Sequence, residues 1–199
     1  MKTGIQIILD EAQSLPVEYQ AYILATAHHE TGGTFQPVRE TFAKSDEQAV
    51  KRMDTAWASG NLPQVSVPYW RPDAGGKAWF GRGYVQLTHR SNYARAARFL
   101  GADLLGNPSL AMEPKIAAKI LVRGMVDGWF TGERLGDFLP GDYTGARRIV
   151  NGTDRAAKIA ALAVGYERQL RNQKPARPWV ALITALWAFI QTIFRRLTK

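Results

Sequence analysis

The sequence predicts a mainly α-helical domain with one small irregular or β-hairpin segment. Three observations point to this fold class. Apolar residues recur at helical spacing through much of the chain, capping residues, glycines and prolines bound those segments, and residues 61–88 lack helical spacing. With 199 residues, of which 46% are hydrophobic, the chain can bury one sizeable core.

The helices are expected in the following order. Residues 3–13 form a short helix, and a longer central helix follows, with Ser14 among its start signals. Ser45 and Gln48 have the spacing of a capping box, which predicts a helix over residues 45–59. Later helices are expected at residues 91–100 (ended by Gly101), 114–129, 142–150 and 154–171.

The central helix ends in a glutamate. Tyr19, Ile23 and Thr26 repeat at helical spacing, and four residues further the same face carries Glu30. The glycine pair at 32–33 then stops the helix. We therefore expect the Glu30 carboxyl to be held rigidly at the edge of the core and partly shielded from water. Such a setting favours the protonated form of the carboxyl.

A second carboxyl, Glu40, lies beyond the glycine pair and Pro37, where we expect a better-solvated loop. Two carboxyls in unequal surroundings can hydrolyse a glycosidic bond, because one keeps its proton for the leaving oxygen while the other stays ionised and activates water. Two glutamates near a helix end are also common as ordinary surface acids. Both interpretations are open on this evidence alone.

Residues 61–80 are irregular and rich in aromatic side chains. Trp70 is a candidate for stacking on a sugar ring, although aromatic residues under a long loop also fill cores. Further on, the alternation from Tyr84 to Thr88 predicts a short strand with Tyr84, Gln86 and Thr88 on one side. This row of phenol, amide and hydroxyl suits sugar binding, and the exposed edge of a small hairpin is the other interpretation.

Three segments resemble glycoside hydrolase family 19, a domain shared by plant-type chitinases and many bacteriophage endolysins. They are HHETGG at 28–33, GRGYVQLTHRSNY at 81–93 and RRIVNG at 147–152, and the resemblance covers roughly residues 5–170. It implies a lysozyme-like, two-lobed helical fold with a cleft between the lobes. It also implies that Glu30 is the general acid and Glu40 the general base.

The resemblance implies roles for further residues. Thr88 corresponds to a Ser or Thr that holds the attacking water, and Arg148 is a neighbour of the carboxylates. Gln86, Asn92 and Asn151 correspond to polar residues around the substrate. The implied reaction is a single displacement with inversion, for which the two carboxyls stand about 6.5–9.5 Å apart so that water fits between base and sugar.

These motifs do not separate chitin from peptidoglycan, because both polymers contain β-1,4-linked N-acetylhexosamine. The short basic chain and the absence of cysteine, of a chitin-binding module and of a recognisable signal peptide favour a phage-type endolysin that cleaves peptidoglycan. A chitinase is the alternative. We expect a monomer that is synthesised in the host cytoplasm and acts in the periplasm or cell wall.

The C-terminal residues are basic and apolar. Residues 171–199 hold six of the 26 Lys and Arg residues and none of the 17 acids. We expect a catalytic domain over residues 1–172, a linker over 173–178 and a hydrophobic helix over 179–199. Residues 179–194 are expected to engage a membrane or lipopolysaccharide, and docking of this helix on the main domain is the alternative.

Other functional classes agree less well with the sequence. Adjacent residues such as His28 and His29 diverge by about 100° on a helix, and neither a His-Glu-x-x-His spacing nor cysteine is present, so we expect no metal or other cofactor. The main domain is only mildly basic and has no nucleic-acid-binding motif, so no nucleic-acid partner is expected. An amidase or endopeptidase, and a membrane-active or wall-binding protein without turnover, stay open.

Overall fold

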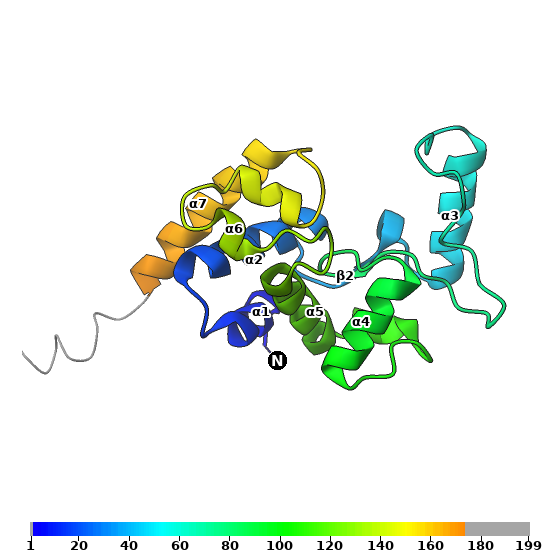
Figure 1. Ribbon diagram of the computed structural model, residues 1–199, viewed down its shortest axis with the longest axis horizontal. Helices are drawn as coiled ribbons and strands as arrows, with labels where there is room; N and C mark the ends of the chain where they lie inside the picture. Colours follow the sequence, from blue (N-terminus) through cyan, green and yellow to red (C-terminus); the bar gives the residue numbers. More distant parts are fainter. Residues whose placement is uncertain (1, 174–199) are drawn as a thin grey trace, which may run out of the picture.

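The computed structural model describes residues 2–173 and is mainly helical there, as predicted (Figure 1). The predicted C-terminal helix at residues 179–199 lies outside the described residues. None of the helices within residues 2–173 is long and apolar enough to span a bilayer. The α-helices are α1 (Gly4–Ala12), α2 (Val17–Glu30), α3 (Asp46–Ala58), α4 (Arg90–Leu100), α5 (Pro114–Asp127), α6 (Leu135–Phe138) and α7 (Ala156–Gln173). Shorter elements are the 3-10 helices η1 (Glu40–Phe42), η2 (Pro108–Met112) and η3 (Gly145–Ile149), and the strands β1 (Val38–Arg39) and β2 (Arg82–Gly83).

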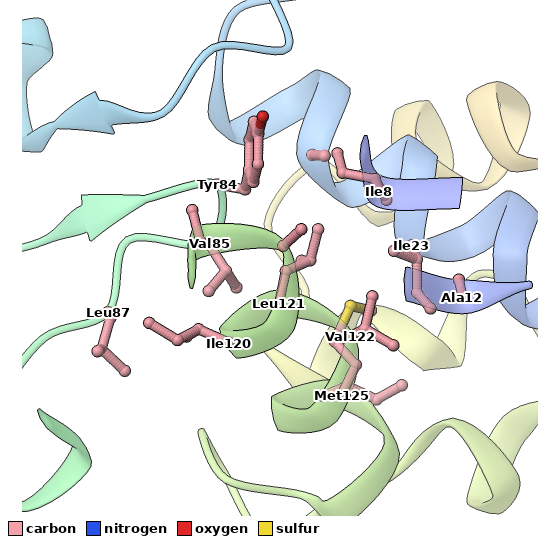
Figure 2. Close-up of a cluster of buried hydrophobic side chains, with 14 of the residues drawn as sticks. Ile8, Ala12, Ile23, Tyr84, Val85, Leu87, Ile120, Leu121, Val122 and Met125 are labelled. Atoms are coloured by element: carbon pink, nitrogen blue, oxygen red, sulfur yellow. The ribbon is translucent and has the colours of Figure 1, made fainter. Parts of the chain in front are cut away.

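Helix α2 runs through the middle of the main hydrophobic core. Ile23 and Thr26 are buried, as the spacing predicted, but so is every residue between Gln20 and Ala27. A helix that is covered on all sides needs small or apolar residues around its whole circumference, and α2 has them. Figure 2 shows Ile23 in one cluster with side chains from α1 and α5. This burial fixes the direction in which the C-terminal end of α2 points.

The local signals place most helix ends correctly. The Ser45 hydroxyl accepts a hydrogen bond from the Gln48 backbone N–H (3.2 Å), so α3 begins where the capping box predicted. Gly101 takes the left-handed conformation (φ 61°) that ends α4. The helix predicted over residues 142–150 is wrong in extent, because only the short 3-10 helix η3 forms there.

The strand predicted from Tyr84 to Thr88 is wrong. Strand β2 stops at Gly83, and β1 pairs with it antiparallel. The chain then makes a tight turn in which Gln86 has φ 56° and the Leu87 N–H donates to the Arg82 carbonyl (2.9 Å). Because the segment turns instead of extending, its alternate side chains do not share one face.

Helix α3 and the aromatic loop after it form a smaller part at one end of the molecule (Figure 1). Its own cluster of buried side chains contains Met53, Trp70 and Phe80. Trp70 is completely buried, and its indole N–H donates to Asp54 (2.9 Å). The predicted role of Trp70 as a sugar-stacking residue is therefore wrong: like most aromatic residues beneath a long loop, Trp70 fills a core.

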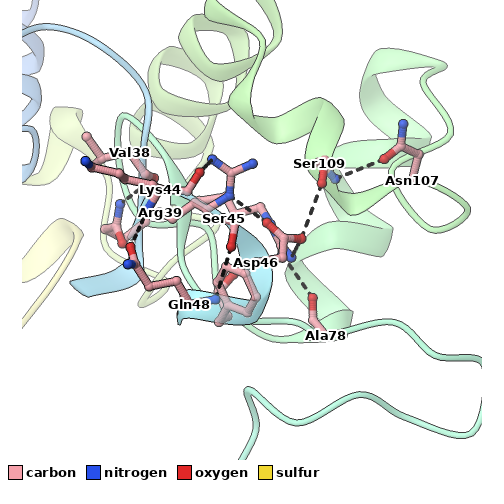
Figure 3. A network of polar contacts seen from close by, with 12 residues as sticks. Val38, Arg39, Lys44, Ser45, Asp46, Gln48, Ala78, Asn107 and Ser109 are labelled. Atoms are coloured by element: carbon pink, nitrogen blue, oxygen red, sulfur yellow. Dashed lines mark hydrogen bonds and ion pairs between the residues drawn. The ribbon is translucent and has the colours of Figure 1, made fainter. Parts of the chain in front are cut away.

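Asp46, the first residue of α3, ties this smaller part to the two strands (Figure 3). Its carboxylate accepts hydrogen bonds from Arg82 Nη2 (2.7 Å) and Arg39 Nε (2.6 Å) and a longer one from the Ser109 hydroxyl (3.4 Å). The Arg82 side chain is only 1% exposed and its guanidinium lies over the Phe80 ring. A buried guanidinium needs such a counter-charge, because an unpaired charge away from water is strongly destabilising.

An Asp46→Ala variant is expected to lower the free energy of unfolding by about 2–3 kcal/mol, because it leaves the buried Arg82 cation without its carboxylate. Urea unfolding followed by circular dichroism measures the change. Asp127→Ala is the matched control: Asp127 pairs with Arg123 on the helix surface, so its loss should change stability by about 0.3–0.5 kcal/mol. Equal midpoints for Asp46→Ala and the parent would contradict the prediction.

The ion pair between Asp46 and Arg82 makes the free energy of unfolding depend on pH. Burial acts to raise the pKa of Asp46, but the hydrogen bonds from Arg82 and Arg39 outweigh it and hold this pKa below its ordinary value. A depressed carboxyl pKa contributes stability that is present above the unfolded value of about 3.9 and is lost as the pH falls through the folded value. The stability difference between the parent and Asp46→Ala should therefore shrink below about pH 4.

Candidate active site

Glu30 is the last residue of α2, at the edge of the core. Gly32 and Gly33 follow with φ of 61° and 83°, and the Gly33 N–H donates back to the His28 carbonyl (2.7 Å). Two left-handed residues in succession reverse the chain immediately, which glycine allows without a steric penalty. The Glu30 side chain stays 17% exposed, so its carboxyl reaches solvent from an otherwise buried helix.

A buried arginine from η3 holds the Glu30 carboxyl. Arg147 Nη1 donates to Glu30 Oε1 (2.9 Å), and Arg147 Nε donates to the Asp154 carbonyl (3.1 Å). Arg147, and not the predicted Arg148, contacts Glu30: Arg148 is exposed, with its guanidinium 5.0 Å from the centre of the Phe138 ring. Successive residues of a 3-10 helix point about 120° apart, so only one of two adjacent arginines can face inward.

Asn151 lies in the turn that follows η3. Its backbone N–H donates to the Arg147 carbonyl (3.1 Å), so the turn adjoins the arginine that holds Glu30. The Asn151 side chain is exposed and accepts a hydrogen bond from the Gly152 N–H (2.9 Å). Its role in substrate binding stays a prediction.

Glu40 follows β1 directly and makes hydrogen bonds through its backbone N–H and both carboxylate oxygens. Its N–H donates to the Gly81 carbonyl (2.7 Å), while its Oε2 accepts from the Gly81 N–H (2.8 Å) and its Oε1 from the Tyr69 hydroxyl (2.6 Å). Two donors on the two oxygens match an ionised carboxylate, which only accepts. A Cβ on Gly81 would lie 2.7 Å from Gln86 Oε1, so a larger residue there would displace the Gln86 amide.

Tyr69 is a site residue that the sequence analysis missed. Burial and the hydrogen bond to Glu40 both raise the Tyr69 pKa above its ordinary value, so the phenol keeps its proton and remains a donor to the carboxylate. Its ring makes edge contacts with Trp70 and His89. The density of aromatic residues in residues 61–80 did indicate a site there, but no local pattern distinguished Tyr69 from its neighbour Trp70 as the functional residue.

The polar residues after Gly81 lie close together, except Tyr84. Gln86 Nε2 donates to the Val38 carbonyl of β1 (3.0 Å), the Thr88 hydroxyl to the Gln86 carbonyl (2.7 Å) and Asn92 Nδ2 to the Thr88 carbonyl (2.9 Å). All three side chains are half-buried. Tyr84 is completely buried in the main core, so its predicted contact with substrate is wrong.

Most of the strained backbone in the described residues lies next to Glu40 and Thr88. Within residues 2–173, six residues other than glycine have φ in the left-handed region. Thr41 and Phe42 directly follow Glu40, and Gln86 and His89 flank Thr88. Each such residue costs on the order of 1–3 kcal/mol and is retained where the surrounding structure requires it, most often at functional sites.

The carboxyl-bearing segments meet through Phe42. A Cβ built on Gly32, two residues after Glu30, would lie 3.6 Å from the Phe42 ring, and Phe42 itself follows Glu40 by two residues. The two acids therefore belong to one region, although their partners differ in kind. Glu30 is paired with a cation, whereas Glu40 accepts from a phenol and a backbone N–H.

The histidines before Glu30 have other partners. His28 Nδ1 is hydrogen-bonded to the Tyr166 hydroxyl of α7 (2.6 Å). Burial lowers the pKa of His29, and the Glu30 carboxylate offsets only part of this effect. In the described part of the chain, no three His, Asp or Glu side chains come together as a metal-binding group.

Comparison with known proteins finds a matching family model, similar curated proteins and similar solved structures. Residues 10–131 match the family model of glycoside hydrolase family 19, described as chitinase class I. The chain is 34% identical over 102 residues to chitinase 3 from Oryza sativa subsp. japonica, covering 50% of this chain and 30% of that protein. It is 47% identical over 105 residues to an endochitinase from Solanum tuberosum, covering 51% and 30%.

Among solved structures, the chain is similar to a class IV chitinase of family GH19 from Zea mays. The TM-score is 0.52 at 19% sequence identity, with 85% of this chain and 78% of that chain covered. This likeness concerns the fold. The chain spans about a third of the length of the curated relatives that it matches.

Proposed function

Since the chain belongs to glycoside hydrolase family 19, we propose that it hydrolyses β-1,4 bonds between N-acetylhexosamine units by single displacement with inversion. The observation that carries this proposal is the pair of neighbouring acids in different hydrogen-bonding surroundings, Glu30 against Arg147 and Glu40 against Tyr69 and Gly81. Inverting hydrolysis needs two neighbouring carboxyls, one as proton donor and one as proton acceptor, and the resemblance to the family assigns the donor role to Glu30.

Glu30 is the general acid. Arg147 occupies Oε1, and among the residues that the structure describes no donor pairs with Oε2, so Oε2 is the atom that carries the proton to the leaving oxygen. Once the proton has left, Arg147 stabilises the new carboxylate through a charge-assisted hydrogen bond. The rigid end of α2 fixes the direction of the transfer.

Glu40 is the general base. Each carboxylate oxygen can accept more than one hydrogen bond, so the contacts with Tyr69 and Gly81 leave room for the attacking water. The Thr88 hydroxyl donates its only proton to the Gln86 carbonyl, and toward a water it can therefore only accept. A water that donates one hydrogen to Glu40 and the other to Thr88 directs its oxygen lone pair at the sugar.

Chitin is the substrate that the relatives favour, because their names describe chitinases and endochitinases. This supports the alternative of the sequence analysis more than its main prediction. Peptidoglycan cleavage by a phage-type endolysin is the second candidate, since the same linkage occurs in that polymer and the C-terminal sequence is basic and apolar. Membrane or lipopolysaccharide binding by residues 179–194, and the place of action, stay predictions from the sequence.

Product analysis tests the proposal. The full chain is incubated with N-acetylglucosamine hexamer or purified peptidoglycan, and proton NMR records the first anomer formed. Inversion at a β-1,4 bond gives the α anomer, with new reducing ends. A β anomer would contradict the mechanism, and new amines without reducing ends would identify an amidase or endopeptidase. Faster formation of reducing ends from the hexamer would favour chitin as the substrate, and faster formation from peptidoglycan would favour peptidoglycan.

A further inference from the structure

We propose that the ring of Phe42 is a platform on which one N-acetylhexosamine ring of the polymer stacks, directly beside the two catalytic carboxyls. The inference rests on the proposed function and assigns a substrate-binding residue to it. Phe42 was not among the residues selected from the sequence, where no local pattern marks it.

The first observation is the exposure of the ring. Phe42 is 60% exposed, although it lies in a segment fixed by the hydrogen bonds of Glu40 to Gly81. A single exposed apolar residue is normal on a protein surface and means little by itself. It does show that the ring contributes little to the core, so another reason for its position is needed.

The second observation is the backbone that presents the ring. Thr41 and Phe42 have φ of 59° and 53°, a conformation that a bulky residue adopts only when its surroundings impose it. Arg52 Nη1 holds the turn by donating to the Thr41 carbonyl (2.8 Å). A strained turn that ends in a mostly exposed aromatic ring gains little burial in return, which indicates that the strain serves to position the ring.

The third observation is the place of the ring. The nearest Phe42 ring atoms lie 3.6 and 3.8 Å from the position of a Cβ on Gly32. Gly32 follows Glu30 by two residues, and Phe42 follows Glu40 by two. The ring therefore lies where the two acid-bearing turns meet, and a polymer that places its scissile bond between the acids passes over it.

The chemistry of the ligand fits such a ring. In a β-1,4-linked N-acetylhexosamine the substituents are equatorial, so each face of the sugar presents axial C–H groups. The π-electron face of an aromatic ring is negative and attracts these slightly positive hydrogens while both surfaces lose water. Phenylalanine adds no polar group that would need its own partner.

Binding measurements separate this role from a structural one. Each variant is made in a Glu30→Gln background, and calorimetry measures its affinity for N-acetylglucosamine hexamer. Phe42→Asn keeps the turn, because asparagine tolerates left-handed backbone, but removes the ring. We expect its Kd to rise about three- to tenfold, by analogy with other aromatic contacts, with an unchanged or higher melting temperature. Phe42→Trp should bind at least as tightly as the Glu30→Gln protein.

Phe99→Ala is the matched control, because Phe99 of α4 is also an exposed phenylalanine (49%) but packs against Trp129, which follows α5. Its Kd should stay within twofold. With Glu30 restored, Phe42→Asn should raise KM and leave kcat within about twofold. A Kd for Phe42→Asn within twofold of that of the Glu30→Gln protein overturns the stacking role and leaves the proposed function standing. If the Glu30→Gln protein binds no hexamer and the full chain cleaves none, both fail together.

Discussion

A Glu30→Gln variant is expected to lose hydrolysis by about a thousandfold or more while keeping its fold, since general acid catalysis is worth roughly 10²–10⁴ in rate and the amide supplies no proton. The fold should survive because the amide oxygen can still accept the hydrogen bond from Arg147 Nη1. The buried guanidinium then keeps a partner, although a neutral one. Initial rates on N-acetylglucosamine hexamer and thermal melting measure the two effects separately.

Glu133→Gln is the control for this experiment, because Glu133 is an exposed glutamate outside the site. It should match the parent in both measurements. Glu30→Asp is informative as well, since it keeps an acid but withdraws the carboxyl by one methylene from the place that α2 and Arg147 define. Its rate should lie between those of the parent and Glu30→Gln. Turnover by Glu30→Gln at the rate of the parent would remove Glu30 from the role of general acid.

The elements that sequence reasoning located correctly have their causes nearby in the chain. The end of α2 is set by Gly32 and Gly33, the start of α3 by Ser45 and the end of α4 by Gly101. Each of these residues acts on a backbone group or a dihedral angle within about one helical turn. A pattern of neighbouring residues is sufficient to predict such features.

The features that sequence reasoning missed depend on distant partners. Arg147 meets Glu30 across 117 positions, and Tyr69 meets Glu40 across 29. The turn at Gln86 has the alternating pattern of a strand, yet the contacts of Gln86 with Val38 and Gly81 hold it in a left-handed conformation. Tertiary contacts overrode the local preference here, as they commonly do in short strands.

In a Glu40→Ala variant, the rate of hydrolysis by water is expected to fall by a factor of roughly 10²–10⁴, because no base remains to take the proton of the water. The loss of the carboxylate also leaves the Tyr69 hydroxyl and the Gly81 N–H without their acceptor. This should lower the free energy of unfolding by about 1–3 kcal/mol, which thermal melting will show.

Azide should restore part of the activity of Glu40→Ala. As an anion, azide needs no base, and the deleted side chain leaves space for it on the side of the sugar opposite the leaving group. Attack from that side on a β-1,4 bond gives an α-glycosyl azide, which NMR distinguishes from the β form. Glu30→Gln should gain nothing from azide, because its leaving oxygen still lacks a proton. If azide rescued Glu30→Gln and left Glu40→Ala inactive, the assignments of acid and base would have to be exchanged.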